Sequence, residues 1–269
     1  MIKREQYMRR IRPFIGSELV KVMTGIRRSG KSVMLELVKE ELVESGVDSA
    51  NFISINFEDM RYGHLLNAQA LHDHVMGLAG QMDGKVYLFF DEIQEVQDWE
   101  RCINSFRVAL DCDIYITGSN AKLLSGELAT YLGGRYVEFV IYPFSFGEFM
   151  ELYRTIEPEA TDARCFQKYL LSGGMPYLAN LRYEDAPSRQ YLTDLFNSVQ
   201  LKDIVKRNKV RDVDLLERII AYVMANVGTT FSASSLGKFF RLVADEAVDV
   251  AESHPQKAAE NIFSHRNDL

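Results

Sequence analysis

The octapeptide Gly25-Ile-Arg-Arg-Ser-Gly-Lys-Ser32 matches the pattern G-x-x-x-x-G-K-[ST] without a gap. In such a loop the glycines let the backbone curl, so that successive N–H groups face phosphate oxygens. The lysine adds a charge at the β- and γ-phosphates, and the final hydroxyl coordinates Mg²⁺. We therefore predict a phosphate-binding loop, with Lys31 on the phosphates and Ser32 on the metal ion.

The residues on either side of this loop have the required setting. Leu19–Met23 has the apolar, β-branched composition of a strand, and Ser32–Val43 carries apolar residues at helical spacing. A helix that begins near Lys31 adds its positive N-terminal dipole to the site. The residues expected to bind the phosphates are Gly25, Arg27, Arg28, Ser29, Gly30, Lys31, Ser32 and Val33.

Strand-like and helix-like segments alternate beyond the loop. Further strands are predicted at residues 51–57, 85–90, 113–117 and 136–141, and helices at residues 67–79 and 99–110. The continuous apolar run Val86–Phe90 is typical of a strand that is buried on both faces. This alternation predicts an α/β fold of the P-loop NTPase type, with a mostly parallel sheet, over residues 1–145.

Two acids, Asp91 and Glu92, follow the buried strand. Ligands of open α/β sheets bind at the carboxyl ends of the strands, where these acids would emerge. We expect Asp91 to hold Mg²⁺ through water and Glu92 to polarise the attacking water as a general base. The alternative is an ordinary strand end with solvated acids.

Three further polar residues are candidates for the same site. Ser119 and Asn120 follow the next strand, and either could contact the γ-phosphate, orient water or cap the following helix. Arg135 comes after two glycines and could reach a γ-phosphate, in cis or across a subunit interface. Alternatively, Arg135 pairs with a carboxylate such as Glu127 or Glu138.

After Pro143 the pattern becomes helical. Ser145 and Glu148 have the spacing of a capping box at the start of the first helix. Helices are expected at residues 145–153, 162–171, 188–209, 212–226 and 232–242. We predict a helical lid over residues 146–209, a partial winged-helix-like segment over 210–254 and a poorly ordered tail over 255–269.

In combination, these motifs resemble those of a known family. They are the loop at 25–32, Asp91-Glu92-Ile-Gln, Thr117-Gly-Ser-Asn, Leu132-Gly-Gly-Arg135 and Pro143-Phe-Ser-Phe-Gly-Glu-Phe. The chain is similar, over about residues 1–242, to prokaryotic AAA-type ATPases of the AAA_14 kind, which usually carry a C-terminal DUF4143 region. The resemblance implies an AAA+/STAND-like core, a helical lid and a winged-helix-like segment.

The same resemblance implies two more nucleotide contacts. Pro176 of Gly174-Met-Pro176 would pack against the nucleotide as in STAND ATPases, although the tripeptide is also a plain helix stop. Pro13, with Ile11 and Phe14, would line the adenine pocket. From Arg241 onward the sequence departs from the family pattern, so we expect a truncated or altered C-terminus.

Composition limits the class of protein. The chain has 269 residues, of which 47% are hydrophobic and 26% charged, with a net charge of -7, as in a folded globular protein. It contains no apolar run of about 18 residues and no visible signal peptide, so we expect no membrane span. The three cysteines are scattered, which favours a cytoplasmic protein without disulfides.

Charge also bears on partners. The overall acidic balance argues against a general nucleic-acid coat, yet residues 1–35 carry nine basic and two acidic residues, which calls for an anionic partner or an acidic surface nearby. Residues 212–226 and 232–242 have helix-turn-helix spacing, but four acids between 245 and 252 would repel DNA. The basic residues between 202 and 211 form either a binding patch or a solvated helix face.

These features predict Mg²⁺-dependent ATP binding and hydrolysis to ADP, coupled to movement of the helical lid. The alternative is a nucleotide-dependent switch or scaffold with negligible turnover that binds a partner protein or DNA. A P-loop kinase is a weaker idea, because no acceptor motif is visible. If Arg135 acts in trans, a homo-oligomer is required.

Overall fold

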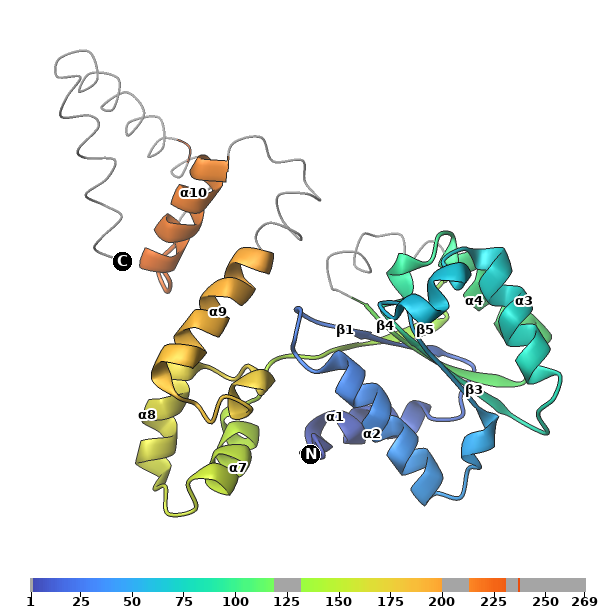
Figure 1. Ribbon diagram of the computed structural model, residues 1–269, viewed down its shortest axis with the longest axis horizontal. Coiled ribbons are helices and arrows are strands. Elements are labelled where there is room, and N and C mark those ends of the chain that lie inside the picture. The colour runs from blue at the N-terminus through green and yellow to red at the C-terminus, as the bar shows by residue number, and fades with distance from the viewer. Residues whose placement is uncertain (1, 119–131, 200–212, 231–236, 238–269) are drawn as a thin grey trace, which may run out of the picture. The chain divides into compact units, whose positions relative to one another are not determined.

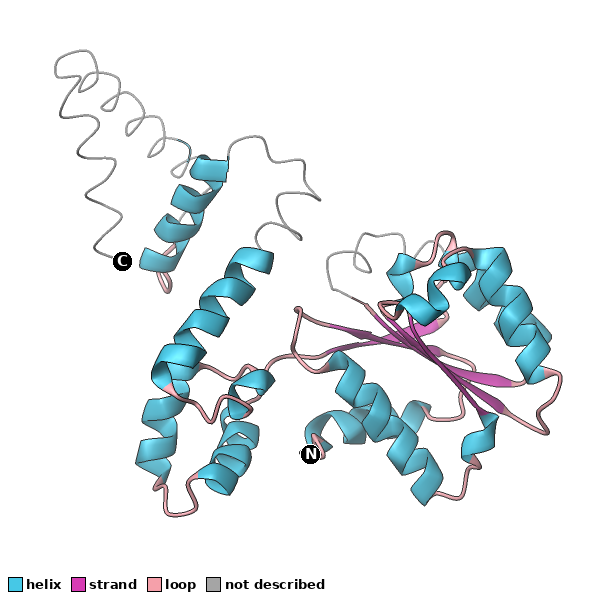
Figure 2. Ribbon diagram, in the orientation of Figure 1, coloured by secondary structure: helices cyan, strands magenta, loops and turns pink. Residues whose placement is uncertain are grey.

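A computed structural model of the chain describes residues 2–118, 132–199, 213–230 and 237. It contains a parallel sheet of five strands in the order β2-β3-β4-β1-β5 (Figures 1 and 2). The strands are β1 Val20–Thr24, β2 Phe52–Asn56, β3 Val86–Asp91, β4 Cys112–Thr117 and β5 Tyr136–Val140. The predicted α/β fold with a parallel sheet is confirmed.

Helices cover both faces of this sheet (Figure 1). On one face lie α1 Glu5–Ile11 and α2 Lys31–Glu44, and on the other lie α3 Ala68–Ala79 and α4 Trp99–Ala109. The short 3-10 helices are η1 Arg12–Phe14, η2 Ser49–Asn51, η3 Met60–Leu65, η4 Ile93–Glu95 and η5 Pro176–Ala179. The helix α1 was not predicted from the sequence.

The central strand β3 serves both cores. Leu88 and Phe90 pack with α3 and α4, whereas Phe89 between them packs with α2 on the opposite face. Because successive side chains of a strand point to opposite faces, a strand covered on both sides must be apolar at every position. This explains the continuous apolar run in the sequence.

A buried ion pair joins β1 to β4. The ammonium of Lys21 donates to the carboxylate of Asp113, and both side chains are fully buried. The same carboxylate accepts hydrogen bonds from the Gly16 amide (2.7 Å) and the Tyr115 hydroxyl (2.8 Å). Burial lowers the pKa of Lys21, and the attraction of Asp113 offsets this only in part.

Helices follow the sheet, as predicted. They are α7 Phe146–Ile156, α8 Asp162–Ser172 and α9 Asp185–Val199, and they share an apolar cluster of their own. The capping box is confirmed, because the Ser145 amide donates to Glu148 Oε2 (2.9 Å) and the Glu148 amide donates to Ser145 Oγ (3.4 Å). The helix α9 begins three residues before the predicted Ser188.

Residues 208–269 separate from residues 1–207 as a second compact unit. Within it the structure describes α10, Val213–Ala225, close to the predicted helix at 212–226. The predicted helix at 232–242 (Gly237 apart), the basic run at 202–211, the acids at 245–252 and the tail at 255–269 lie outside the described residues. Among the described helices, none combines the length and apolar character needed to cross a bilayer.

Candidate nucleotide-binding site

The loop after β1 requires both glycines of its pattern. Gly25 has a φ of 147°, and a Cβ atom there would lie 2.2 Å from the carbonyl oxygen of Ile141. This close approach follows from the bond between the Ile141 amide and the Thr24 carbonyl (2.7 Å). Gly30 has a φ of 98° and caps α2. A side chain at Gly25 would force the loop apart, and at Gly30 it would strain the backbone.

Lys31 lies across the loop that precedes it. It is the first residue of α2, and only 5% of its side chain is exposed. Its ammonium donates to the carbonyl oxygens of Gly25 and Ile26, both at 3.3 Å. These bonds hold the charge of Lys31 within the loop, the position predicted from the sequence.

Asp91, at the end of β3, is fixed from two neighbouring strands. Its carboxylate accepts hydrogen bonds from the Thr117 hydroxyl of β4 and from the Asn56 side-chain amide of β2 (3.1 Å). The Thr117 hydroxyl also accepts from the Glu92 amide (3.0 Å). Sequence reasoning did not assign Asn56 or Thr117 to the site. The signal was that each is a polar residue at the carboxyl end of a strand beside β3.

Glu92 turns toward the loop in a left-handed conformation, with a φ of 55°. One carboxylate oxygen, Oε1, lies 3.8 Å from the Lys31 ammonium. The other accepts a hydrogen bond from the side-chain amide of Gln94. The structure therefore brings the predicted lysine and the predicted general base together.

A cavity of about 340 Å³ lies at this point. The start of α2, Glu92 and part of the helical region all contribute to its walls. The lining residues are Arg27, Arg28, Gly30, Lys31, Ser32, Val33, Glu58, Glu92, Pro176, Tyr177 and Asn180. Eight of these were predicted, whereas Glu58, Tyr177 and Asn180 were not. Glu58 accepts a hydrogen bond from Arg27 (3.3 Å), and Tyr177 and Asn180 lie just beyond the predicted Pro176.

Pro176 owes its position to Gly174. A Cβ atom at Gly174 would lie 2.1 Å from the Phe144 carbonyl oxygen, because the Phe144 amide donates to the Gly174 carbonyl (2.7 Å). The Tyr169 hydroxyl donates to the same Phe144 oxygen (3.1 Å). The tripeptide follows the end of α8 and brings Pro176 to the wall of the cavity, and packing of Pro176 against a nucleotide stays a prediction.

The remaining predicted residues lie elsewhere. Pro13 is exposed in η1 and is not among the residues that line the cavity. Arg135 is exposed before β5, where its carbonyl accepts from the Val20 amide (3.0 Å). Because β1 and β5 are parallel, Arg135 lies at the edge of the sheet opposite Gly25, about 20 Å away along six residues of strand. It cannot reach the loop of its own chain. Ser119 and Asn120 lie outside the described residues.

The parallel sheet and the loop after β1 define an α/β fold of the P-loop class. Within that class, residues 17–150 match the AAA_14 family, described as an AAA domain. Residues 163–252 match a different family, DUF8612, a domain of unknown function. The chain therefore carries an AAA-type domain followed by a separate C-terminal domain. The expected DUF4143 region is not confirmed.

Two curated relatives are uncharacterized proteins. One, from Haemophilus influenzae, is 37% identical over 237 residues, which are 88% of this chain and 58% of the relative. The other, from Methanocaldococcus jannaschii, is 31% identical over 221 residues, which are 77% of this chain and 47% of the relative. The chain thus spans about half the length of the curated relatives that it matches.

Solved structures show weaker similarity. AMPPCP-bound DnaA from Aquifex aeolicus has a TM-score of 0.43 and 16% identity, and the match covers 85% of this chain and 71% of that one. A RuvB mutant from Thermotoga maritima has a TM-score of 0.46 and 14% identity, covering 87% and 80%. Likeness at this level does not identify a function.

Proposed function

We propose that this protein hydrolyses ATP in a Mg²⁺-dependent reaction and couples its nucleotide state to the helical region. One observation carries the proposal: Lys31 and Ser32 of the loop line the same cavity as Glu92. A loop built to bind phosphates and a carboxylate able to activate water therefore face one space.

The donor atoms available near the loop fit Mg²⁺. The ion prefers oxygen ligands and keeps several waters, and the Ser32 hydroxyl and the Asp91 carboxylate supply oxygen. Asn56 and Thr117 hold Asp91 in place by hydrogen bonds, as residues behind the ligands of a metal site commonly do. Ser32 would bind the ion directly and Asp91 through water. When bound, Mg²⁺ supplies positive charge to the phosphate oxygens.

The protein's own groups perform the remaining tasks. Backbone N–H groups of the loop and the start of α2 bind the phosphates, and Lys31 neutralises the charge that spreads over the γ-phosphate. Glu92 accepts the proton of a water whose oxygen bonds to the γ-phosphorus. The bond from that phosphorus to the β–γ bridging oxygen breaks, and ADP and phosphate result.

The residues that line the cavity support coupling to the helical region. Pro176, Tyr177 and Asn180 of that region line the cavity together with Gly30 and Lys31 of the loop. A nucleotide in this space would contact both parts, so a change from ATP to ADP would change the contact between them.

The test is a pair of substitutions in the full chain. Glu92→Gln is expected to retain ATP binding and to abolish phosphate release, because the amide cannot accept the proton. Lys31→Ala is expected to weaken ATP binding by about tenfold or more, because a charged hydrogen-bonding group is lost. The matched control is Lys39→Ala, farther along α2, where the lysine bonds Glu36 and Ser54. Unchanged phosphate release in Glu92→Gln would reject Glu92 as the base.

A nucleotide-dependent switch with negligible turnover is the second candidate. The carboxylate of Glu92 is already engaged by Gln94 and lies near Lys31, which would restrain it from activating water. Tight ATP binding by the unsubstituted chain, with no phosphate release at any Mg²⁺ concentration, would favour this function.

A further inference from the structure

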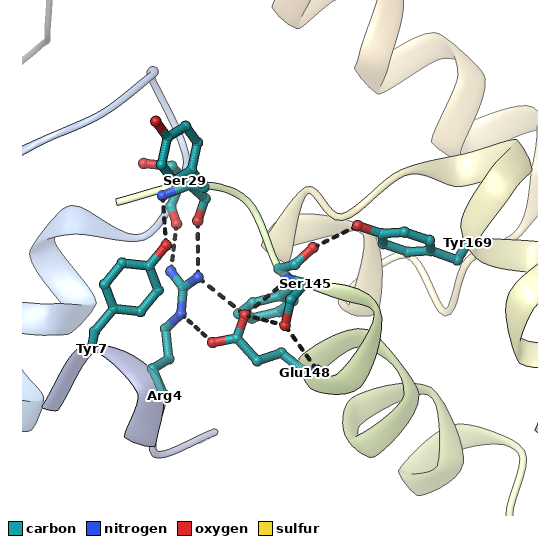
Figure 3. A network of polar contacts seen from close by, with 8 residues as sticks. Arg4, Tyr7, Ser29, Ser145, Glu148 and Tyr169 are labelled. Atoms are coloured by element: carbon teal, nitrogen blue, oxygen red, sulfur yellow. Dashed lines mark hydrogen bonds and ion pairs between the residues drawn. The ribbon is translucent and has the colours of Figure 1, made fainter. Parts of the chain in front are cut away.

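Arg4 joins three segments that are far apart in the sequence (Figure 3). Its guanidinium donates to the Ser29 carbonyl of the loop (3.2 Å), to the Tyr142 carbonyl (2.9 Å) and to the Glu148 carboxylate of α7 (2.8 and 3.3 Å). We infer that Arg4 is a positioning residue that sets the phosphate-binding loop and ties it to α7. The inference rests on the proposed function for its effect on nucleotide binding.

The contact with Ser29 bears directly on the phosphate site. The Ser29 carbonyl and the Gly30 N–H belong to one planar trans peptide, so they point in opposite directions. With the carbonyl held on Arg4, the Gly30 N–H faces away from the guanidinium. Gly30 lines the cavity, and its N–H is one of the donors expected to bind phosphate. Arg4 thereby fixes the direction of an N–H group that would donate a hydrogen bond to phosphate, without itself touching the nucleotide.

The contact with Glu148 bears on the helical region. Glu148 also closes the capping box of α7 with Ser145. Burial by itself would raise the pKa of Glu148, but hydrogen bonds from Arg4 and from the Ser145 amide bring the pKa below its usual value. The carboxylate is therefore charged at neutral pH, and the start of α7 shares one guanidinium with the loop.

The cost of this arrangement supports a functional role. Arg4 has a left-handed backbone, with a φ of 45°, and only 2% of its side chain is exposed. A strained residue and a buried charge both lower stability unless the surroundings compensate. The guanidinium lies over the rings of Tyr7 (4.5 Å) and Phe144 (5.2 Å), which completes its enclosure. A lysine could not reproduce this, because it lacks the planar fork of donors.

The test compares Arg4→Lys and Glu148→Gln with the control Arg12→Gln. Arg12 likewise forms ion pairs, with Glu5 and Glu41, but on the exposed surface. Arg4→Lys is expected to raise the Kd of an ATP analogue by about tenfold or more and to reduce the nucleotide-induced rise in melting temperature. Arg12→Gln should leave both as in the unsubstituted chain. If Arg4→Lys lowers the melting temperature but leaves the Kd and the nucleotide-induced rise unchanged, its role is merely structural and the inference is wrong.

Hydrogen exchange without nucleotide separates this inference from the proposed function. Arg4→Lys should speed exchange in the loop at residues 26–31 and in the first turn of α7 together, and Glu148→Gln should do so more weakly. Faster exchange in α7 alone would overturn the inference. An unsubstituted chain that binds no nucleotide would overturn the proposed function. The exchange measurement would still test whether Arg4 ties the loop to α7.

Discussion

Gly25 and Gly174 both allow close backbone contact with one short segment, residues 141–144. A Cβ atom at Gly25 would collide with the Ile141 carbonyl, and one at Gly174 would collide with the Phe144 carbonyl. The segment 141–144 connects β5 to α7, so its backbone is held between the phosphate-binding loop and the Gly174-Met-Pro176 turn. Two single residues therefore set the path along which the helical region leaves the sheet.

Replacing Gly174 by alanine should be costly. The added methyl group would meet backbone rather than a flexible side chain, so we expect a loss of about 2 kcal/mol in the free energy of unfolding. The control is Gly147→Ala in α7, where a Cβ meets nothing within 4 Å and alanine favours the helix. Urea denaturation of both variants measures the difference. Equal stability of the two would contradict the close approach at Gly174.

At the scale of elements, the sheet depends on a buried charge pair as well as on apolar packing. Lys21 on β1 and Asp113 on β4 are fully buried, and Asp113 also binds the Gly16 amide that precedes β1. Breaking one partner of such a pair leaves an uncompensated charge in the interior. The pair thus holds β1, which leads into the loop, in register with β4, which ends beside the candidate site.

Lys21→Met should therefore destabilise the protein by about 3 kcal/mol or more in the free energy of unfolding. Lys85→Met provides the control, because Lys85 pairs with Asp111 at the exposed end of the neighbouring strands (3.2 Å) and should cost about 1 kcal/mol or less. Both values come from urea denaturation at neutral pH. A Lys21→Met variant as stable as Lys85→Met would show that the buried pair contributes little.

Element boundaries were largely predictable, and the exception is instructive. The five strands and the helices α2 to α4 begin and end within a few residues of their predicted positions, because hydrophobic spacing is a local property of the sequence. The helix α1 was missed. It has only seven residues. Its apolar side chains, Tyr7, Met8 and Ile11, are buried in the core between the sheet and α2, a contact that the local sequence does not reveal. Its first turn also follows Arg4, whose conformation depends on distant partners.

At the scale of the whole molecule, the position of Arg135 determines how it could act. It lies at the edge of the sheet opposite its own loop, so the cis alternative is not available. A role on the γ-phosphate would require the loop of a second subunit. A homo-oligomer, like a partner protein, DNA and a cytoplasmic location, stays a prediction.

If Arg135 acts across an interface, Arg135→Ala should lower ATP turnover by about 10³-fold and leave ATP binding unchanged. An equal mixture of Arg135→Ala and Glu92→Gln chains should regain part of the activity, because some sites would combine an intact glutamate with an intact arginine. Arg107→Ala, near the same edge, where Arg107 bonds the Glu18 carbonyl (3.2 Å), is the control. A fully active monomer, by light scattering, would exclude the role.

The sequence by itself determined the class of fold, the phosphate-binding loop and the acids after β3, because each depends on residue types at fixed short spacings. Only the tertiary structure decided which distant residues support them. Asn56 and Thr117 come from separate strands, and Arg4 and Glu148 are separated by 144 positions. Such partnerships depend on how the strands align and how the chain returns to the loop, and no local pattern in the sequence records either.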